Sequence, residues 1–167
     1  MTDSFLHTLL TNLTLDEKIG QLHQHHLSNG QDLGFLRQGG AGSIINASGA
    51  LTGIGQSRSS AAETCNYLQR LALESPHPIP LLFGRDVIHG YRTVFPIPLA
   101  QAASFNPGLA EEAAATAACE ATADGIKWTF APMLDIARDP RWGRIAEGNG
   151  EDPYLGARIA EAVIRGF

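Results

Sequence analysis

The chain has 167 residues, of which 44% are hydrophobic and 17% charged, and its formal net charge is −5. This composition is typical of a globular domain and excludes a disordered or fibrous chain. The negative charge and the absence of a basic run exclude nucleic acid and an anionic membrane as the main partner.

The beginning of the chain carries no recognisable targeting signal. No apolar run approaches the ~20 residues that cross a bilayer, and the opening MTDSFLHTLL lacks a basic region and a small-residue cleavage site. The sequence as written therefore predicts a cytoplasmic chain, although a periplasmic or secreted location stays open. Cys65 and Cys119 fall in predicted helices among apolar neighbours, so we expect two buried free thiols.

The first elements are predicted to be helical. Residues 4–13 form an apolar helix, and the capping box at residues 14–17 begins a second helix that runs toward Leu22. His23, His25 and His26 follow. They lack the i, i+4 spacing of a helical metal site, so we expect a helix end with surface histidines and no metal.

Glycines surround the first predicted strand. Residues 33–37 predict a short helix that ends at Gly39 and Gly40, and residues 42–46 predict a buried strand. The glycine-rich GGAGS precedes this strand, whereas a phosphate-binding loop follows a strand and begins a helix. A nucleotide site is therefore disfavoured. Residues 50–60, which are rich in Gly, Ser and Thr, predict a surface loop.

The next pattern is a helix and a second strand. Residues 61–73 predict the helix, and residues 79–83 form a short apolar run typical of a parallel strand that is covered on both faces. The polar segment 84–92 follows directly. Residues 95–99, with two prolines, are expected to be extended.

A third strand lies between two helices with clear start signals. Asn106-Pro107 begins an alanine-rich helix that ends near Asp124, residues 127–132 predict the strand, and Asp152-Pro153 begins the last helix. Alternating helices and strands predict an α/β fold with a parallel sheet and right-handed crossovers. Because three strands leave such a sheet incomplete, we expect the first part of a larger domain.

Two charged loops follow predicted strands, and they are the candidate site. Asp86 in the first and Arg144 in the second are expected at the same end of the sheet. A carboxylate that accepts from two vicinal hydroxyls beside a guanidinium suits a sugar, and Trp142 offers a stacking face. The alternative is that the arginines of residues 131–155 only pair with nearby carboxylates and hold the loop rigid.

Three stretches of the sequence resemble a known family. LTLDEKIGQL (13–22), GRDVIHGYRTVFPIPLAQAASFNP (84–107) and APMLDIARDPRWGRIAEGNGEDPYL (131–155) look like the N-terminal part of family 3 glycoside hydrolases, of the bacterial β-glucosidase and β-xylosidase type. The resemblance implies that residues 1–167 are the first part, about three βα units, of an incomplete (β/α)8 TIM-like barrel domain, with no second domain in the chain.

The resemblance also implies an activity. Such enzymes are retaining and exo-acting, and they hydrolyse terminal non-reducing β-D-glucosyl or β-xylosyl residues with two carboxyls ~5 Å apart, so neither metal nor organic cofactor is implied. The family pattern assigns Asp86 and Arg144 to substrate binding in the −1 subsite. Arg92 is expected at the rim of the pocket, or in a surface ion pair. The N-acetylglucosaminidase branch is disfavoured, because residues 84–88 lack its acidic-glycine motif.

The catalytic groups of the family have no counterpart in these 167 residues. The nucleophile, the acid/base and a sugar-binding Lys-His pair come later in the family, so no catalytic residue is assigned here and the fragment alone is expected to be inactive. Its partners would be a small β-glucoside and the missing remainder of the enzyme. His89 is expected to be packed and to form a hydrogen bond within the loop, Trp142 to pack against the loop, and Glu147 to support the arginine loop. The alternative is a non-catalytic sugar-binding or assembly module.

Overall fold

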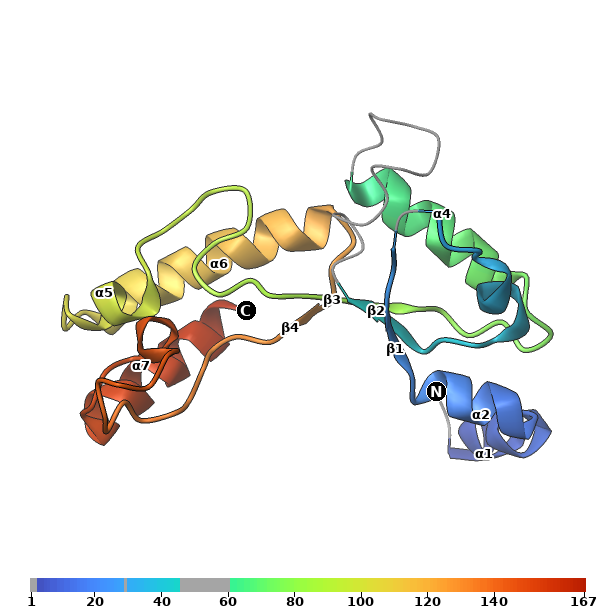
Figure 1. Ribbon diagram of the computed structural model, residues 1–167, viewed down its shortest axis with the longest axis horizontal. Helices are drawn as coiled ribbons and strands as arrows, with labels where there is room; N and C mark the ends of the chain where they lie inside the picture. Colours follow the sequence, from blue (N-terminus) through green and yellow to red (C-terminus); the bar gives the residue numbers. More distant parts are fainter. Residues whose placement is uncertain (1–2, 29, 46–60) are drawn as a thin grey trace. The chain divides into compact units, whose positions relative to one another are not determined.

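The computed structural model describes residues 3–28, 30–45 and 61–167 (Figure 1). The chain divides into two compact units. The first comprises Met1–Arg85 and Asp124–Trp128, and the second comprises Asp86–Ala123 and Thr129–Phe167. The loop predicted at residues 50–60 lies outside the described residues.

The first unit is organised around parallel strands. They are β1 (Gln24–His26), β2 (Ser43–Ile45) and β3 (Leu82–Arg85), followed in the sheet by β4 (Trp128–Thr129), in the order β1-β2-β3-β4. The pairs β1/β2 and β2/β3 are parallel. Ile44 and Phe83 are Cα partners and both are buried. The predicted parallel α/β arrangement is confirmed.

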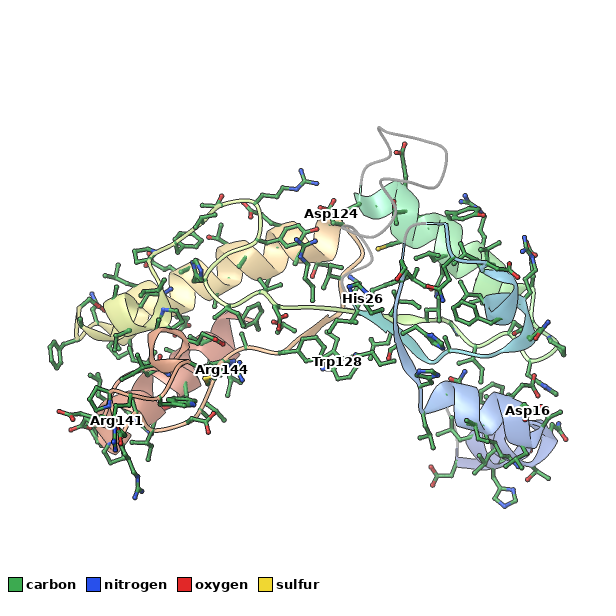
Figure 2. All side chains as sticks on the ribbon, viewed as in Figure 1. Asp16, His26, Asp124, Trp128, Arg141 and Arg144 are labelled. Atoms are coloured by element: carbon green, nitrogen blue, oxygen red, sulfur yellow. The ribbon has the colours of Figure 1, made fainter. Side chains whose placement is uncertain are left out.

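Strand β1 was not predicted. We expected three strands and placed the histidines of residues 23–26 at a helix end, but residues 24–26 form a fourth strand. Its residues, Gln24 to His26, are all polar, so the sequence has no apolar alternation to mark a strand. Contacts with residues 35 and 40 stabilise β1. The ring centroids of His25 and Phe35 are 4.4 Å apart, and the His25 Nε2 lies 3.1 Å from the carbonyl oxygen of Gly40. His26 is the last residue of β1 (Figure 2).

The helices of this unit follow their predicted signals. They are α1 (Asp3–Asn12), α2 (Leu15–Gln21), the 3₁₀ helix η1 (Gly34–Gln38) and α4 (Ala61–Leu73). Gly39 ends η1 with φ 71°, a left-handed conformation that glycine adopts without strain. Strand β3 begins later than predicted. The prolines at 78 and 80 have no backbone N–H to donate, which explains why pairing begins only after them.

The two cysteines are both free, and only one of them is buried. Cys65 lies on the inner side of α4, and burial raises the pKa of its thiol to about 11. Cys119 is exposed, so the prediction that it is buried is wrong. It belongs to an alanine-rich helix, in which small residues surround the whole circumference and do not mark the inner face.

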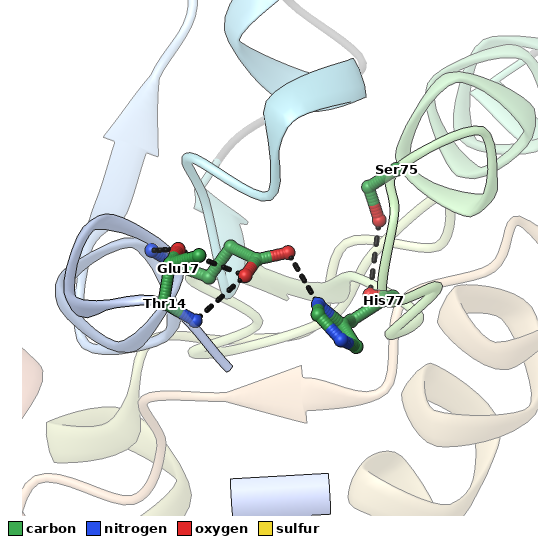
Figure 3. A network of polar contacts seen from close by, with 4 residues as sticks. All are labelled: Thr14, Glu17, Ser75 and His77. Carbon is green, nitrogen blue, oxygen red and sulfur yellow. Dashed lines mark hydrogen bonds and ion pairs between the residues drawn. The ribbon is translucent and has the colours of Figure 1, made fainter. Parts of the chain in front are cut away.

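Glu17 connects the beginning of α2 with a distant segment (Figure 3). Its Oε2 accepts from the N–H of Thr14 at 2.9 Å and from the Thr14 hydroxyl at 2.8 Å, while the N–H of Glu17 donates to that hydroxyl oxygen. Its Oε1 lies 2.9 Å from Nδ1 of His77, 60 positions along the chain. The predicted capping box is confirmed, and it also fastens α2 to the segment before β3.

These contacts predict a pH-dependent stability. The bond from the Thr14 N–H, followed by the His77 contact, lowers the pKa of Glu17 from 4.5 to about 2. A carboxyl whose pKa is lowered by folding stabilises the fold above its ordinary value, and that contribution is lost as the pH falls from 4.5 toward 2. We therefore expect the urea midpoint of the chain to exceed that of Glu17→Gln at pH 7, and the difference to shrink at pH 3 and below.

The matched control is Asp16→Asn. Asp16 is the neighbouring carboxylate of α2, and it is exposed and makes no side-chain hydrogen bond to any residue that the structure describes. Its substitution is expected to leave the pH dependence unchanged. A Glu17→Gln difference that is the same at pH 7 and at pH 2.5 would contradict the assignment.

The second unit consists of helices and the two charged loops. Its helices are α5 (Pro98–Ala102), α6 (Pro107–Ala123), the 3₁₀ helix η2 (Ile145–Glu147) and α7 (Pro153–Gly166). The predicted cap of α7 is present, since the Leu155 N–H donates to Oδ1 of Asp152 at 2.8 Å. At Asn106 the side-chain oxygen accepts from the Gly108 N–H at 3.1 Å. Ile159 of α7 is buried against Ala102 and Ala110.

Two predictions for this part of the chain are wrong at their boundaries. Residues 95–99 are not extended throughout, because Pro98 begins α5, and proline is well tolerated at the first position of a helix. The strand predicted at 127–132 is shorter, and β4 contains only Trp128 and Thr129. The rest of that apolar run leads into the second charged loop. In the described part of the chain, no helix is long and apolar enough to cross a membrane.

Candidate functional site

Asp86 begins a loop that is closed by its own main chain. It follows β3 directly, and the loop turns back where Gly90 and Val94 form an isolated antiparallel bridge. Gly90 has φ 121°, and a β-carbon there would lie 1.9 Å from the Thr93 carbonyl oxygen, so only glycine fits the turn. The loop is therefore held in one shape before any ligand is considered.

His89 is part of this closure. Its Nδ1 lies 2.8 Å from the carbonyl oxygen of Phe95, and the Phe95 N–H donates to the carbonyl oxygen of His89 at 2.8 Å. The expectation that His89 forms a hydrogen bond within the loop is confirmed. This bond fixes the ring at the wall of a cavity.

The cavity lies between the first loop and η2 of the second loop. Its volume is about 240 Å³, and it is lined by Asp86, Ile88, His89, Gly90, Ile97, Pro98, Ala146 and Glu147. Asp86 is exposed and forms no hydrogen bond or ion pair with any residue that the structure describes. Its two carboxylate oxygens are therefore available to a ligand.

Arg144 does not itself line this cavity, but it pairs with Glu147, which does. The ion pair is bidentate, with Nε 3.0 Å from Oε1 and Nη2 2.7 Å from Oε2. This hydrogen bond raises the pKa of Arg144 and lowers that of Glu147. The negative charges of Asp135 and Asp86 also raise the pKa of Arg144. The structure thus brings the two residues predicted to bind a sugar, Asp86 and Arg144, within electrostatic range of each other.

Other members of the charged loop have structural partners. Arg141, which is labelled in Figure 2, forms an ion pair with Asp139. Its Nε lies 3.0 Å from Oδ1, and its backbone N–H donates to the same oxygen. Trp142 is half-buried and does not line the cavity of Asp86. Both arginines therefore pair with nearby carboxylates, as the alternative of a supporting frame predicted. The Arg144–Glu147 pair differs in that Glu147 also lines the cavity.

Arg92 is placed at the tip of the first loop. Its N–H donates to Oε2 of Glu120 at 2.8 Å, and the residue does not contribute to the lining of the cavity. Glu120 was not a candidate in the sequence, because it lies in the last turn of a helix whose alanine pattern indicates only a scaffold. Only the packing of the loop on α6 reveals its role.

The described residues show no arrangement suited to a metal. No group of three or more His, Cys, Asp or Glu side chains in residues 3–28, 30–45 and 61–167 is placed to hold a metal ion. A second cavity, of about 560 Å³, lies along α7, and its lining includes Leu134, Ile136, Ala160 and Ile164. It lacks the Asp86 carboxylate and is mainly apolar, so the smaller cavity is the candidate site.

Comparison with known proteins identifies the family. The sequence model of the glycosyl hydrolase family 3 N terminal domain matches residues 14–167. The chain is 40% identical over 169 residues to a periplasmic beta-glucosidase of Salmonella typhimurium, covering 98% of this chain and 20% of the relative. It is 42% identical over 169 residues to a beta-xylosidase of Formosa agariphila, with 99% and 18% covered. The chain thus spans about a fifth of the length of these relatives.

Solved structures agree in fold. A beta-glucosidase from Listeria innocua superimposes with a TM-score of 0.83 at 38% identity, covering 100% of this chain and 24% of that one. An exo-1,3/1,4-beta-glucanase from a Pseudoalteromonas species gives a TM-score of 0.85 at 29% identity, with 98% and 21% covered. With the parallel sheet, these superpositions confirm the α/β fold class and agree with part of a (β/α)8 barrel. The chain belongs to glycoside hydrolase family 3, of whose N-terminal domain it contains a part.

Proposed function

We propose that this chain supplies the first part of a retaining, exo-acting β-glucosidase-like enzyme that removes terminal β-D-glucosyl or β-xylosyl residues from non-reducing ends. All of residues 1–167 would belong to its barrel domain. The family membership and the relatives, which include beta-glucosidases and a beta-xylosidase, support this proposal. The observation that carries it is the unbonded Asp86 carboxylate in the cavity next to the Arg144–Glu147 pair.

The geometry suits a polyhydroxylated, uncharged ligand. A carboxylate such as Asp86 only accepts hydrogen bonds, and its two oxygens match two neighbouring sugar hydroxyls. A guanidinium has five N–H donors. Glu147 engages Nε and Nη2 of Arg144, so the donors of Nη1 remain for a sugar oxygen. Arg92, at the loop tip, would contribute at the rim of the site.

The cavity alone is not a complete site. Its volume of about 240 Å³ lies below the ~300–1,000 Å³ of typical ligand pockets. A retaining mechanism also needs two carboxyls ~5 Å apart, one as nucleophile and one as acid/base. We assign neither to this chain. Its residues would hold the sugar ring while groups from the rest of the enzyme break the glycosidic bond.

The test compares the chain alone with a chimera. In the chimera, this chain replaces the segment of the Listeria innocua beta-glucosidase on which it superimposes. We expect the purified 167-residue chain to show no turnover of 4-nitrophenyl β-D-glucoside above the uncatalysed rate, and the folded chimera to hydrolyse it. Turnover by the chain alone that disappears in Asp86→Ala would contradict the division of roles. A folded, inactive chimera together with millimolar glucose binding by the chain would instead favour the non-catalytic module.

A further inference from the structure

We propose that Glu120 of α6 is a positioning residue for the sugar site, because its carboxylate holds the tip of the loop that carries Asp86 and His89. The effect of Glu120 on catalysis rests on the proposed function. The contact between Glu120 and the loop tip is part of the described structure and consists of three hydrogen bonds.

The three bonds converge on one carboxylate. Oε2 of Glu120 accepts from the N–H of Arg92 at 2.8 Å and from the N–H of Thr93 at 2.9 Å, while Oε1 accepts from the Thr93 hydroxyl at 2.7 Å. The Thr93 hydroxyl, then the Thr93 N–H, lower the pKa of Glu120, and the Arg92 N–H and charge act in the same direction. The carboxylate is therefore ionised at neutral pH, and hydrogen bonds to an ionised acceptor are the stronger kind.

The tip that Glu120 holds is continuous in the chain with the wall of the cavity. Residues 89–95 are closed on themselves by the Gly90–Val94 bridge and by the paired His89–Phe95 contacts. Six of the eight residues that line the cavity come from residues 86–98: His89 and Gly90 belong to that closure, and the other four flank it. A tilt of the tip on α6 would therefore displace His89 and Gly90 directly and would pull on the flanking residues, Asp86 among them.

Glu120 acts through the loop and does not contact the ligand space. It is absent from the lining of the cavity, and it reaches the loop from 27 and 28 positions away in the sequence. Removing a tether of this kind displaces the binding groups without deleting any of them. Misplacement by about 1 Å costs on the order of 10²-fold in rate, even when the change is remote from the chemistry.

The experiment uses the active chimera and variants of Glu120. For Glu120→Ala we expect kcat/KM to fall about 10- to 100-fold, with a rise in KM. Partial unfolding would not raise KM, since it lowers only the amount of active enzyme. Hydrogen–deuterium exchange should become faster at the amides of Arg92 and Thr93 and stay unchanged in α7. Glu120→Gln, which keeps one accepting oxygen, should recover part of the activity.

Two further variants keep the test independent of folding defects. Glu112→Ala is the matched control, because Glu112 is an exposed carboxylate of the same helix whose side chain is bonded to no residue in the described part of the chain. It should leave activity and exchange unchanged. Thr93→Val removes only the hydroxyl bond and leaves α6 intact, so it should show the same changes at smaller size.

The outcomes separate the two proposals. If Glu120→Ala speeds exchange at the loop tip but leaves kcat and KM unchanged, Glu120 is only a structural tether and the inference is overturned. Unchanged exchange overturns it as well. If the unsubstituted chimera is folded but inactive, the proposed function fails, and with it the positioning role, while the exchange data still report whether the tether exists.

Discussion

Asp86→Ala is expected to lower kcat/KM of the chimera about 10³-fold. The Asp86 carboxylate lines the cavity and bonds to no residue in the described part of the chain. Each hydrogen bond from a neutral sugar hydroxyl to a charged group is worth about 1.5–3 kcal/mol. Two such bonds give ~3–6 kcal/mol, which corresponds to roughly 10²–10⁴-fold. Asp86→Asn, which keeps one accepting oxygen, should retain more activity than alanine. The measurement is the steady-state rate with 4-nitrophenyl β-D-glucoside.

The control for Asp86 is Asp135→Asn. Asp135 is an exposed carboxylate whose charge also acts on Arg144, but it does not line the small cavity. It therefore reproduces the loss of a negative charge near Arg144 without removing a group from the site. A change of less than threefold, or about 0.6 kcal/mol, is expected. Equal losses for both aspartates would show that Asp86 acts only through the charge of the loop.

Arg144→Lys is expected to lower kcat/KM nearly as much as Arg144→Ala, on the order of 10²-fold. Lysine keeps the positive charge but not the planar fork. It can form only a single point contact with Glu147, so the orientation that the bidentate pair imposes on the side chain is lost. The same kinetic assay measures this, and circular dichroism checks that η2 and α7 remain folded.

Arg141→Lys provides the comparison. Arg141 forms an analogous ion pair with Asp139 in the same segment, but Asp139, unlike Glu147, is absent from the lining of the cavity. We expect it to retain most of the activity. If Arg144→Lys is equally active, the bidentate geometry has no functional value and only the charge at position 144 contributes.

The sequence predicted the features that depend on neighbouring residues. Thr14 and Asp152 bond to the backbone of the turn that follows them, so their helix starts are visible in four consecutive letters. Asp86 and Arg144 were candidates because each belongs to a charged loop after a predicted strand, where parallel folds place their sites. Their proximity to one cavity is the outcome of that topology.

The missed features depend on contacts between distant residues. Strand β1 consists of polar residues and forms because β2 pairs with it. No local sequence pattern could therefore predict it. The bond of Glu17 to His77 spans 60 positions, and the bonds of Glu120 to the loop tip span 27 and 28. Cys119 was assigned to the inside because the small residues of α6 hide which side faces the core.

Glu120 binds the main chain of the loop more than its side chains, and this affects which positions can be varied to change the substrate preference. Two of its three bonds are to backbone N–H groups, which every residue except proline provides. These two backbone bonds therefore do not depend on which side chain stands at position 92. A library randomised at position 92 would vary the chemistry at the proposed rim of the site, while both backbone bonds to Glu120 stay available in every variant except proline. Position 92 is thus a starting point for the directed evolution of new sugar or aglycone preferences, and position 90, restricted to glycine, is not.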